Sequence, residues 1–215
     1  MIRDALATVL DPELDQPITE LGFVASASVS AGHATVRLRL PTYFCAPNFA
    51  YLMVADAHDA VLALPEVSTV DVQLTDHFAS AEINAGVAGG AGFAGSFPGE
   101  ATAELDELRL TFRRKAYLAS LDRVASRLGR DPVGLSLGEV PASPELSSLL
   151  RRRAELGLPD TPDSPLLLDE HGVELGAGEA PLRLRFARAV RVSIDGNAGF
   201  CRGLLRTRYP EVAAG

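Results

Sequence analysis

The 215-residue chain is long enough for two modest domains, because one domain usually takes about 100 to 200 residues. Its hydrophobic content of 47%, with no tryptophan, predicts folded cores built from alanine, valine and leucine. No apolar run reaches the length of a membrane span and the first residues lack a signal-peptide pattern, so we expect a cytoplasmic protein without membrane contact. Two cysteines cannot build a disulfide framework, and both thiols are expected to be free.

Charge is distributed unevenly along the chain. Up to Asn84 there are 3 Lys and Arg against 11 Asp and Glu, whereas the remainder holds 17 of each kind. The net charge of -8 therefore belongs to the first part. Such an acidic module disfavours nucleic acid, whose binding depends on neutralising phosphates, and it favours an electropositive protein partner.

The first part of the chain alternates helical and extended patterns in the order α-β-β-α-β. The predicted elements are helix 3–10, strands 23–29 and 34–40 of one hairpin, helix 48–64 with Asn48 as its N-cap, and strand 67–74. We expect an α/β (α+β) domain over residues 1–85, with a small mixed three-stranded sheet and two helices.

The second part of the chain begins after a glycine-rich segment. Residues 86–99 contain six glycines and no charge, which is typical of a flexible tether or a mobile loop. An α+β domain of unknown type is expected over residues 100–215. Its predicted elements are a helical pair at 103–128 and 143–156, a hairpin at 166–175, short strands over 182–194, and a last helix that begins near Asn197.

Cys45 lies where the second strand breaks against prolines just before an apolar helix. A residue before a helix N-terminus faces unpaired backbone amides and the positive end of the dipole, which favours the reactive thiolate. Packing under the junction is the alternative interpretation. A cysteine hydrolase would need a base, and none of the four histidines sits in a cysteine-protease signature.

A closed metal site is weakly indicated, since zinc usually takes four ligands that often occur in close pairs. Cys45, Cys201 and His77 are the candidates to converge on a metal or cluster. Cys201 is predicted in the first turn of the last helix beside Arg202, conditions that lower a thiol pKa, with core packing as the alternative. A transient site, formed by one chain or shared across a homodimer, would use few thiolates per chain.

Acidic residues at element boundaries would support such a site: Asp11, Glu13 and Asp76. The alternative for the first two is a solvent-facing turn after the first helix. For Asp76 and the adjacent His77 the alternative is local bonding to the backbone at the end of a strand.

Several linked motifs in the first part resemble a known family. They are Val9-Leu10-Asp11-Pro12-Glu13, Ile18-Thr19-Glu20-Leu21-Gly22-Phe23-Val24, Thr42-Tyr43-Phe44-Cys45-Ala46-Pro47, Leu64-Pro65-Glu66-Val67 and Val70-Asp71-Val72-Gln73-Leu74. Their order and spacing are similar to those of the small iron-sulfur cluster assembly domain of SufT-like and PaaD-like proteins. The resemblance covers residues 1 to about 84. Ala46 stands where the family often has a proline, and the second part lacks the cysteine-rich module of PaaD-like proteins.

The resemblance implies a non-enzymatic factor that matures iron-sulfur or di-iron proteins. It places the functional thiol at Cys45, with Asp11, Glu13, Thr42 and Asp76 as motif neighbours. The cargo would be iron or an iron-sulfur cluster, bound transiently and not needed for folding, and the partner a client metalloprotein. Similar fusions accompany bacterial multicomponent monooxygenases, which implies an oxygenase subunit as client. The alternatives are a thiol enzyme that uses Cys45 with His77, and an adaptor in which neither thiol reacts.

Overall fold

A computed structural model of the chain describes residues 1–101 and 105–210. The chain divides into two compact units. Unit 1 comprises Met1–Glu107 and Gly196–Gly215, and unit 2 comprises Leu108–Asp195. Within the described ranges, no helix combines the length and the apolar character needed to cross a membrane.

Unit 1 is built on a mixed three-stranded sheet in the order β3-β4-β5. Strands β3 (Val24–Ser30) and β4 (His33–Leu38) form an antiparallel hairpin, and β5 (Thr69–Leu74) pairs with β4 in parallel. The hairpin turn needs two left-handed residues, Ala31 and Gly32, with φ of 48° and 80°. The predicted α/β class and mixed sheet are confirmed.

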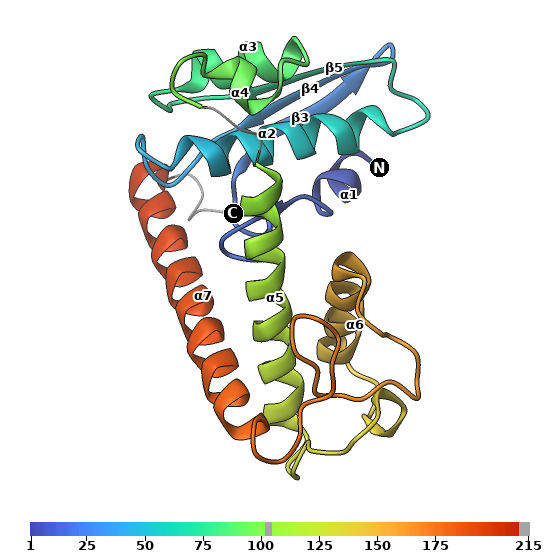
Figure 1. The fold of residues 1–215 in the computed structure, drawn as a ribbon. Coiled ribbons are helices and arrows are strands. Elements are labelled where there is room, and N and C mark those ends of the chain that lie inside the picture. Colours follow the sequence, from blue (N-terminus) through green and yellow to red (C-terminus); the bar gives the residue numbers. More distant parts are fainter. Residues whose placement is uncertain (102–104, 211–215) are drawn as a thin grey trace. The chain divides into compact units, whose positions relative to one another are not determined.

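Helices α1 (Ile2–Leu6) and α2 (Pro47–Leu62) complete the predicted α-β-β-α-β order, and Figure 1 shows α2 running along the sheet. Alternate residues of β4 and β5 are buried beneath helical residues of α2, because strands and helices present one face at periods of two and about 3.6. The core members from these elements are Ala34, Val36, Leu38, Val72, Leu74, Ala50, Met53, Val54, Ala57 and Val61. A short antiparallel pair, β1 (Leu10–Asp11) and β2 (Gln16–Pro17), closes the loop between α1 and the sheet.

The glycine-rich segment 86–99 is largely helical, so the expectation of a flexible tether or a mobile loop is wrong. Helix α3 (Ser80–Ala88) runs into it and α4 (Gly92–Ser96) follows. The ring of Phe93 packs edge-on against Tyr51 with centroids 5.5 Å apart. A Cβ atom on Gly86 would lie 1.8 Å from Ser96 Oγ, so this glycine permits the two helices to approach. Here glycine serves close packing.

Unit 2 contains α5 (Asp106–Arg127), the 3-10 helix η1 (Leu137–Glu139) and α6 (Pro144–Leu156). The predicted helical pair is therefore present, and residues 103–104 of its first predicted helix lie outside the described residues. Ser143 caps α6 by accepting a hydrogen bond from the Leu146 amide at 3.2 Å. In place of the expected hairpin at 166–175, a single antiparallel bridge joins Leu168 and Glu174.

Helix α7 (Ala180–Arg208) occupies the segment expected to form strands over 182–194, and that expectation is wrong. The alternating Leu182, Leu184 and Phe186 suggested a strand, yet the buried residues follow helical spacing. Those buried residues are Ala180, Ala187, Ile194, Ala198 and Leu205. Leu182 and Phe186 are instead exposed. The helix also starts well before Asn197, the predicted beginning of the last helix.

The last turns of α7 belong to unit 1 and pack on its core through Ala198 and Leu205. Side chains from these turns bind the rest of the unit at several points. Arg202 donates to Gln16 Oε1 at 2.6 Å, and Arg208 donates to the carbonyl of Leu40 at 3.2 Å. Figure 1 shows this end of α7 in red beside the loop that precedes α2. The C-terminal turns therefore reach the sheet ends where Cys45 lies.

Candidate functional site

Cys45 lies at the start of α2 and is half-buried. Ala46 is the N-cap residue and Pro47 the first helical residue, so the expectation of Asn48 as N-cap is wrong, since proline is pre-formed for the first helical position. The hydroxyl of Thr42 lies 3.3 Å from Cys45 Sγ, and its oxygen accepts from the Phe44 amide. The hydroxyl proton is then free to point at the sulfur.

His77 is buried and holds the loop that carries Cys45. Its Nδ1 accepts from the Ala79 amide at 3.2 Å, which leaves the proton on Nε2 to donate to the Cys45 carbonyl at 2.7 Å. Burial lowers the pKa of His77 below its usual value and favours this neutral ring. Both nitrogens bind backbone groups, so the ring is not arranged as a base for the Cys45 thiol.

Replacing His77 with alanine is expected to loosen the Cys45 loop. The free energy of unfolding should fall by about 2 kcal/mol, since the Cys45 carbonyl loses its donor and a cavity replaces the ring. Denaturant unfolding and the alkylation rate of Cys45 measure the two effects, and the rate should rise. His77→Gln, which keeps a donor, should lose less stability, and exposed His171→Ala should change neither quantity. Equal rates in wild type and His77→Ala would contradict the positioning role.

Cys201 lies inside α7 and is half-buried in unit 1. Burial, followed by the negative charges of Asp11, Cys45 and Glu13, raises the pKa of the Cys201 thiol to about 11. The expectation of a lowered pKa is therefore wrong, because the helix begins at Ala180 and its N-terminus is distant. Both cysteines pack against the core of unit 1, and the charge of Cys45 is among the causes that raise the pKa of Cys201.

Asp11 is buried, in contrast to the solvent-facing turn that was the alternative for this residue. Its Oδ1 accepts from the amides of Glu13 and Leu14, both at 2.9 Å, and so closes the turn between β1 and β2. Burial raises the pKa of Asp11 to about 6 although both of these hydrogen bonds act to lower it. The Glu13 carboxylate accepts from Asn197 of α7 at 3.4 Å.

Asp76 follows β5 in a left-handed conformation with φ of 53°. Its carboxylate accepts from the Tyr209 hydroxyl at 2.9 Å, and its carbonyl accepts from Arg208. Asp76 thus fastens the end of the chain's last helix to the strand end beside His77. Among the residues that the structure describes, no group of three or more His, Cys, Asp or Glu side chains is arranged to hold a metal ion.

Three aromatic residues beside Cys45 were not singled out from the sequence. Tyr43, Phe44 and Phe78 lie with ring centroids 5.1 to 6.3 Å apart, and Phe44 is 78% exposed. The adjacent Tyr43 and Phe44 are visible in the sequence as an aromatic pair at the site loop. Phe78 joins them only through the fold, since a different strand end delivers it.

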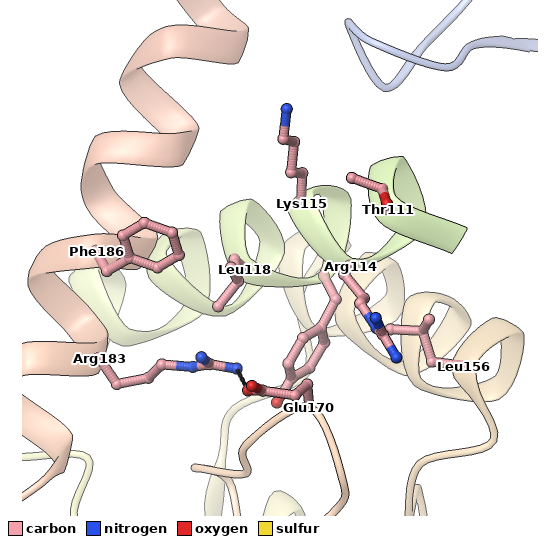
Figure 2. Close-up of a pocket in the computed structure, with 9 residues that line it drawn as sticks. Thr111, Arg114, Lys115, Leu118, Leu156, Glu170, Arg183 and Phe186 are labelled. Carbon is pink, nitrogen blue, oxygen red and sulfur yellow. Dashed lines mark hydrogen bonds and ion pairs between the residues drawn. The ribbon is translucent and has the colours of Figure 1, made fainter. Parts of the chain in front are cut away.

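A pocket of about 260 Å³ in unit 2 contains none of the predicted site residues. Figure 2 shows Arg183 pointing to Glu170, which it binds at 2.6 Å, and Phe186 and Leu118 lining the apolar side. The ammonium of Lys115 lies 4.5 Å from the centroid of the Phe112 ring. The pocket therefore has a mixed lining in which the Arg183 charge is already balanced.

Residues 1–72 match the model of the family described as iron-sulfur cluster assembly protein. This part of the chain is thus similar to an iron-sulfur cluster assembly domain, which confirms the resemblance seen in the motifs. The match supports a role in iron-sulfur cluster assembly or maturation in general, as a factor that works with client proteins. Searches of curated proteins and of solved structures returned no match. The matched region contains Asp11, Thr42 and Cys45, whereas Cys201 lies outside it.

Proposed function

We propose that the protein is a maturation factor for an iron-sulfur or di-iron protein, and that Cys45 presents the metal or cluster to its client. The observation that supports the proposal is that Cys45, in the matched assembly region, and Cys201, on the last helix, pack against the same core. Two thiols beside carboxylates combine soft and hard ligands for iron. The factor would bind its cargo transiently and would not need it to fold.

The surroundings of the two thiols suggest different tasks for them. Cys45 sits on a loop with a hydroxyl proton available from Thr42, so it is suited to the first contact with cargo. Cys201 holds its proton more tightly, because burial and nearby negative charge raise its pKa to about 11. Its recruitment as a ligand would release that proton and give a site that binds and gives up its cargo. Asp11 and Glu13, whose charges act on Cys201, would offer oxygen ligands once these side chains rearrange around the cargo.

The remaining ligands would come from the client or from a second copy in a homodimer, since one chain supplies few soft ligands. An oxygenase subunit as the client remains a prediction from the resemblance. We also propose that the sequence divides into an assembly-like domain, residues 1–85, a glycine-rich segment, residues 86–99, and a C-terminal region, residues 100–215, whose last turns fold onto the first domain. The His77 ring, bound to backbone on both nitrogens, favours this role over a thiol enzyme.

Anaerobic reconstitution with ferrous iron and sulfide tests the proposal. Wild type is expected to retain iron with a sulfur-to-iron absorbance band, and Cys45→Ala to retain about tenfold less, because ligand loss sharply weakens metal sites. Cys201→Ala should fall between the two. Iron analysis, absorbance and a far-ultraviolet spectrum that reports folding are the measurements. Equal iron retention by wild type and by the combined variant Cys45→Ala, Cys201→Ala, or full client maturation by Cys45→Ala, would favour the adaptor alternative.

A further inference from the structure

The loops around Cys45 expose an aromatic surface, defined here as Tyr43, Phe44 and Phe78. Their side chains are 47%, 78% and 48% exposed. Single exposed apolar residues are normal on protein surfaces, but here three rings contact one another on two separate loops. Buried aromatic residues carry much of the binding energy of protein interfaces. The aromatic surface thus has the composition of an interface centre.

Hydrogen bonds between the two loops hold this surface in place. The Phe78 amide donates to the Tyr43 carbonyl at 3.2 Å, and the adjacent His77 ring donates to the Cys45 carbonyl at 2.7 Å. The His77 ring also stacks on Phe78 with centroids 4.8 Å apart. Because these contacts fix the backbone before a partner arrives, binding costs less conformational entropy. The same contacts set the position of Cys45 relative to the rings.

The charge of unit 1 indicates which sign of charge a partner of the aromatic surface should carry. Unit 1 carries 16 acidic and 6 basic residues in its sequence. The carboxylates of Glu13 and Asp76 accept hydrogen bonds from uncharged groups, and neither has an ion-pair partner in the described part of the chain. Three arginines offset part of this charge: Arg208 acts electrostatically on His77, Arg39 lies 4.9 Å from the centroid of the Tyr209 ring, and Arg202 acts on Cys201. The acidic excess of unit 1 as a whole still favours a cationic partner.

We propose that the aromatic surface docks the client polypeptide through a segment with an apolar anchor flanked by arginine or lysine residues. The anchor would pack on Phe44 and Phe78, and the basic flanks would face the carboxylates near the thiols. A client docked there would bring its own metal ligands close to Cys45. These would be the further ligands that one chain of this protein does not supply. This inference rests on the proposed function, because it names the partner of the same site.

Selection from a random library of short displayed peptides tests the proposal with the full-length chain as bait. The selection is depleted on the empty support, and enriched peptides are synthesised for affinity measurements on wild type and on the double variant Phe44→Ser, Phe78→Ser. They are expected to combine aromatic or aliphatic anchors with arginine or lysine. Their binding to the double variant should be at least about tenfold weaker, as for the loss of central interface aromatics. It should also weaken as salt is raised.

Matched variants keep the outcomes distinct. Phe186→Ala, which removes an exposed phenylalanine in unit 2, should bind the peptides as wild type does. Cys45→Ala should also bind them, so that docking and metal retention are separated. Peptides that bind the double variant equally, or that carry acidic flanks, would overturn the inference. A wild-type dimer that becomes monomeric in the double variant would assign the surface to a second copy and overturn it too. Neither result would alter iron retention by Cys45.

Discussion

Asp11→Asn is expected to become more stable relative to wild type as the pH rises. Between pH 4 and pH 8 the difference in free energy of unfolding between the two proteins should grow by up to about 3 kcal/mol in favour of the variant. The side chain is buried, and burial raises the pKa of Asp11 to about 6 from the ordinary value of 3.8. Asparagine keeps the oxygen that accepts from the Glu13 and Leu14 amides, so the turn is preserved. It removes only the charge that folding leaves in a poorly solvated place.

The direction with pH follows from which state of the chain binds the proton more tightly. Well below the ordinary pKa of 3.8 the Asp11 carboxyl is protonated in both the folded and the unfolded chain, and its contribution to stability is fully present. As the pH rises towards the folded pKa of about 6, the unfolded chain has already ionised and the contribution is lost. Asparagine does not ionise, so the contribution of this position to stability should not be lost in Asp11→Asn as the pH rises.

Denaturant unfolding of wild type and Asp11→Asn from pH 4 to pH 8 measures this effect in the metal-free protein. Asp59, whose side chain is 82% exposed, supplies the control, and Asp59→Asn should follow the wild-type pH dependence. A constant difference between wild type and Asp11→Asn at every pH would contradict the prediction. We also expect Asp11→Asn to retain less iron, because functional sites often keep groups that cost stability.

The sequence was sufficient to predict the α-β-β-α-β order of the first domain. The alternating pattern of β3 to β5 fits only a strand, and the three-and-four spacing of apolar residues in α2 fits only a helix. The hydrophobic pattern led to a wrong prediction where the two-residue period of a strand and the 3.6-residue period of a helix overlap. Leu182, Leu184 and Phe186 alternate, but Ala187, Ile194 and Ala198 supply the helical face that is actually buried. Small alanines carry little hydrophobic signal in a pattern, so the strand-like residues dominated the prediction.

The candidate site was predictable only in part, for a similar reason. Cys45 and Thr42 are close in sequence, and their contact follows from the loop before α2. Cys201 comes from the far end of the chain, and its environment depends on where α7 begins and which turns pack on unit 1. Local patterns do not contain that information. The apparent advantage of Arg202 beside Cys201 was outweighed by burial and by carboxylates contributed from the β1 to β2 loop.

Cys201 is expected to react about 100-fold more slowly with iodoacetamide at pH 8 in the folded chain than in denaturant. Only the thiolate attacks, and a pKa of about 11 leaves about 100-fold less of it at pH 8 than the ordinary value of 9.0. The Cys45→Ala variant isolates this thiol, and mass spectrometry follows its alkylation from pH 7 to pH 11. The rate should rise about tenfold per pH unit up to about pH 10 and level off near 11.

The pH profile separates the raised pKa of Cys201 from simple shielding of its sulfur. A sulfur that is merely hard to reach would react slowly at every pH, but its rate would level off near the ordinary pKa of 9.0. A thiol held protonated by burial and by Asp11 continues to gain reactivity above that pH. Asp11→Asn removes one negative neighbour and should move the rate profile of Cys201 to lower pH. Burial should still hold the pKa of Cys201 above its value in the denatured chain. A profile that levels off near pH 9 and ignores Asp11→Asn would show that the two groups do not share an environment, and the candidate site would then reduce to Cys45 and its loop.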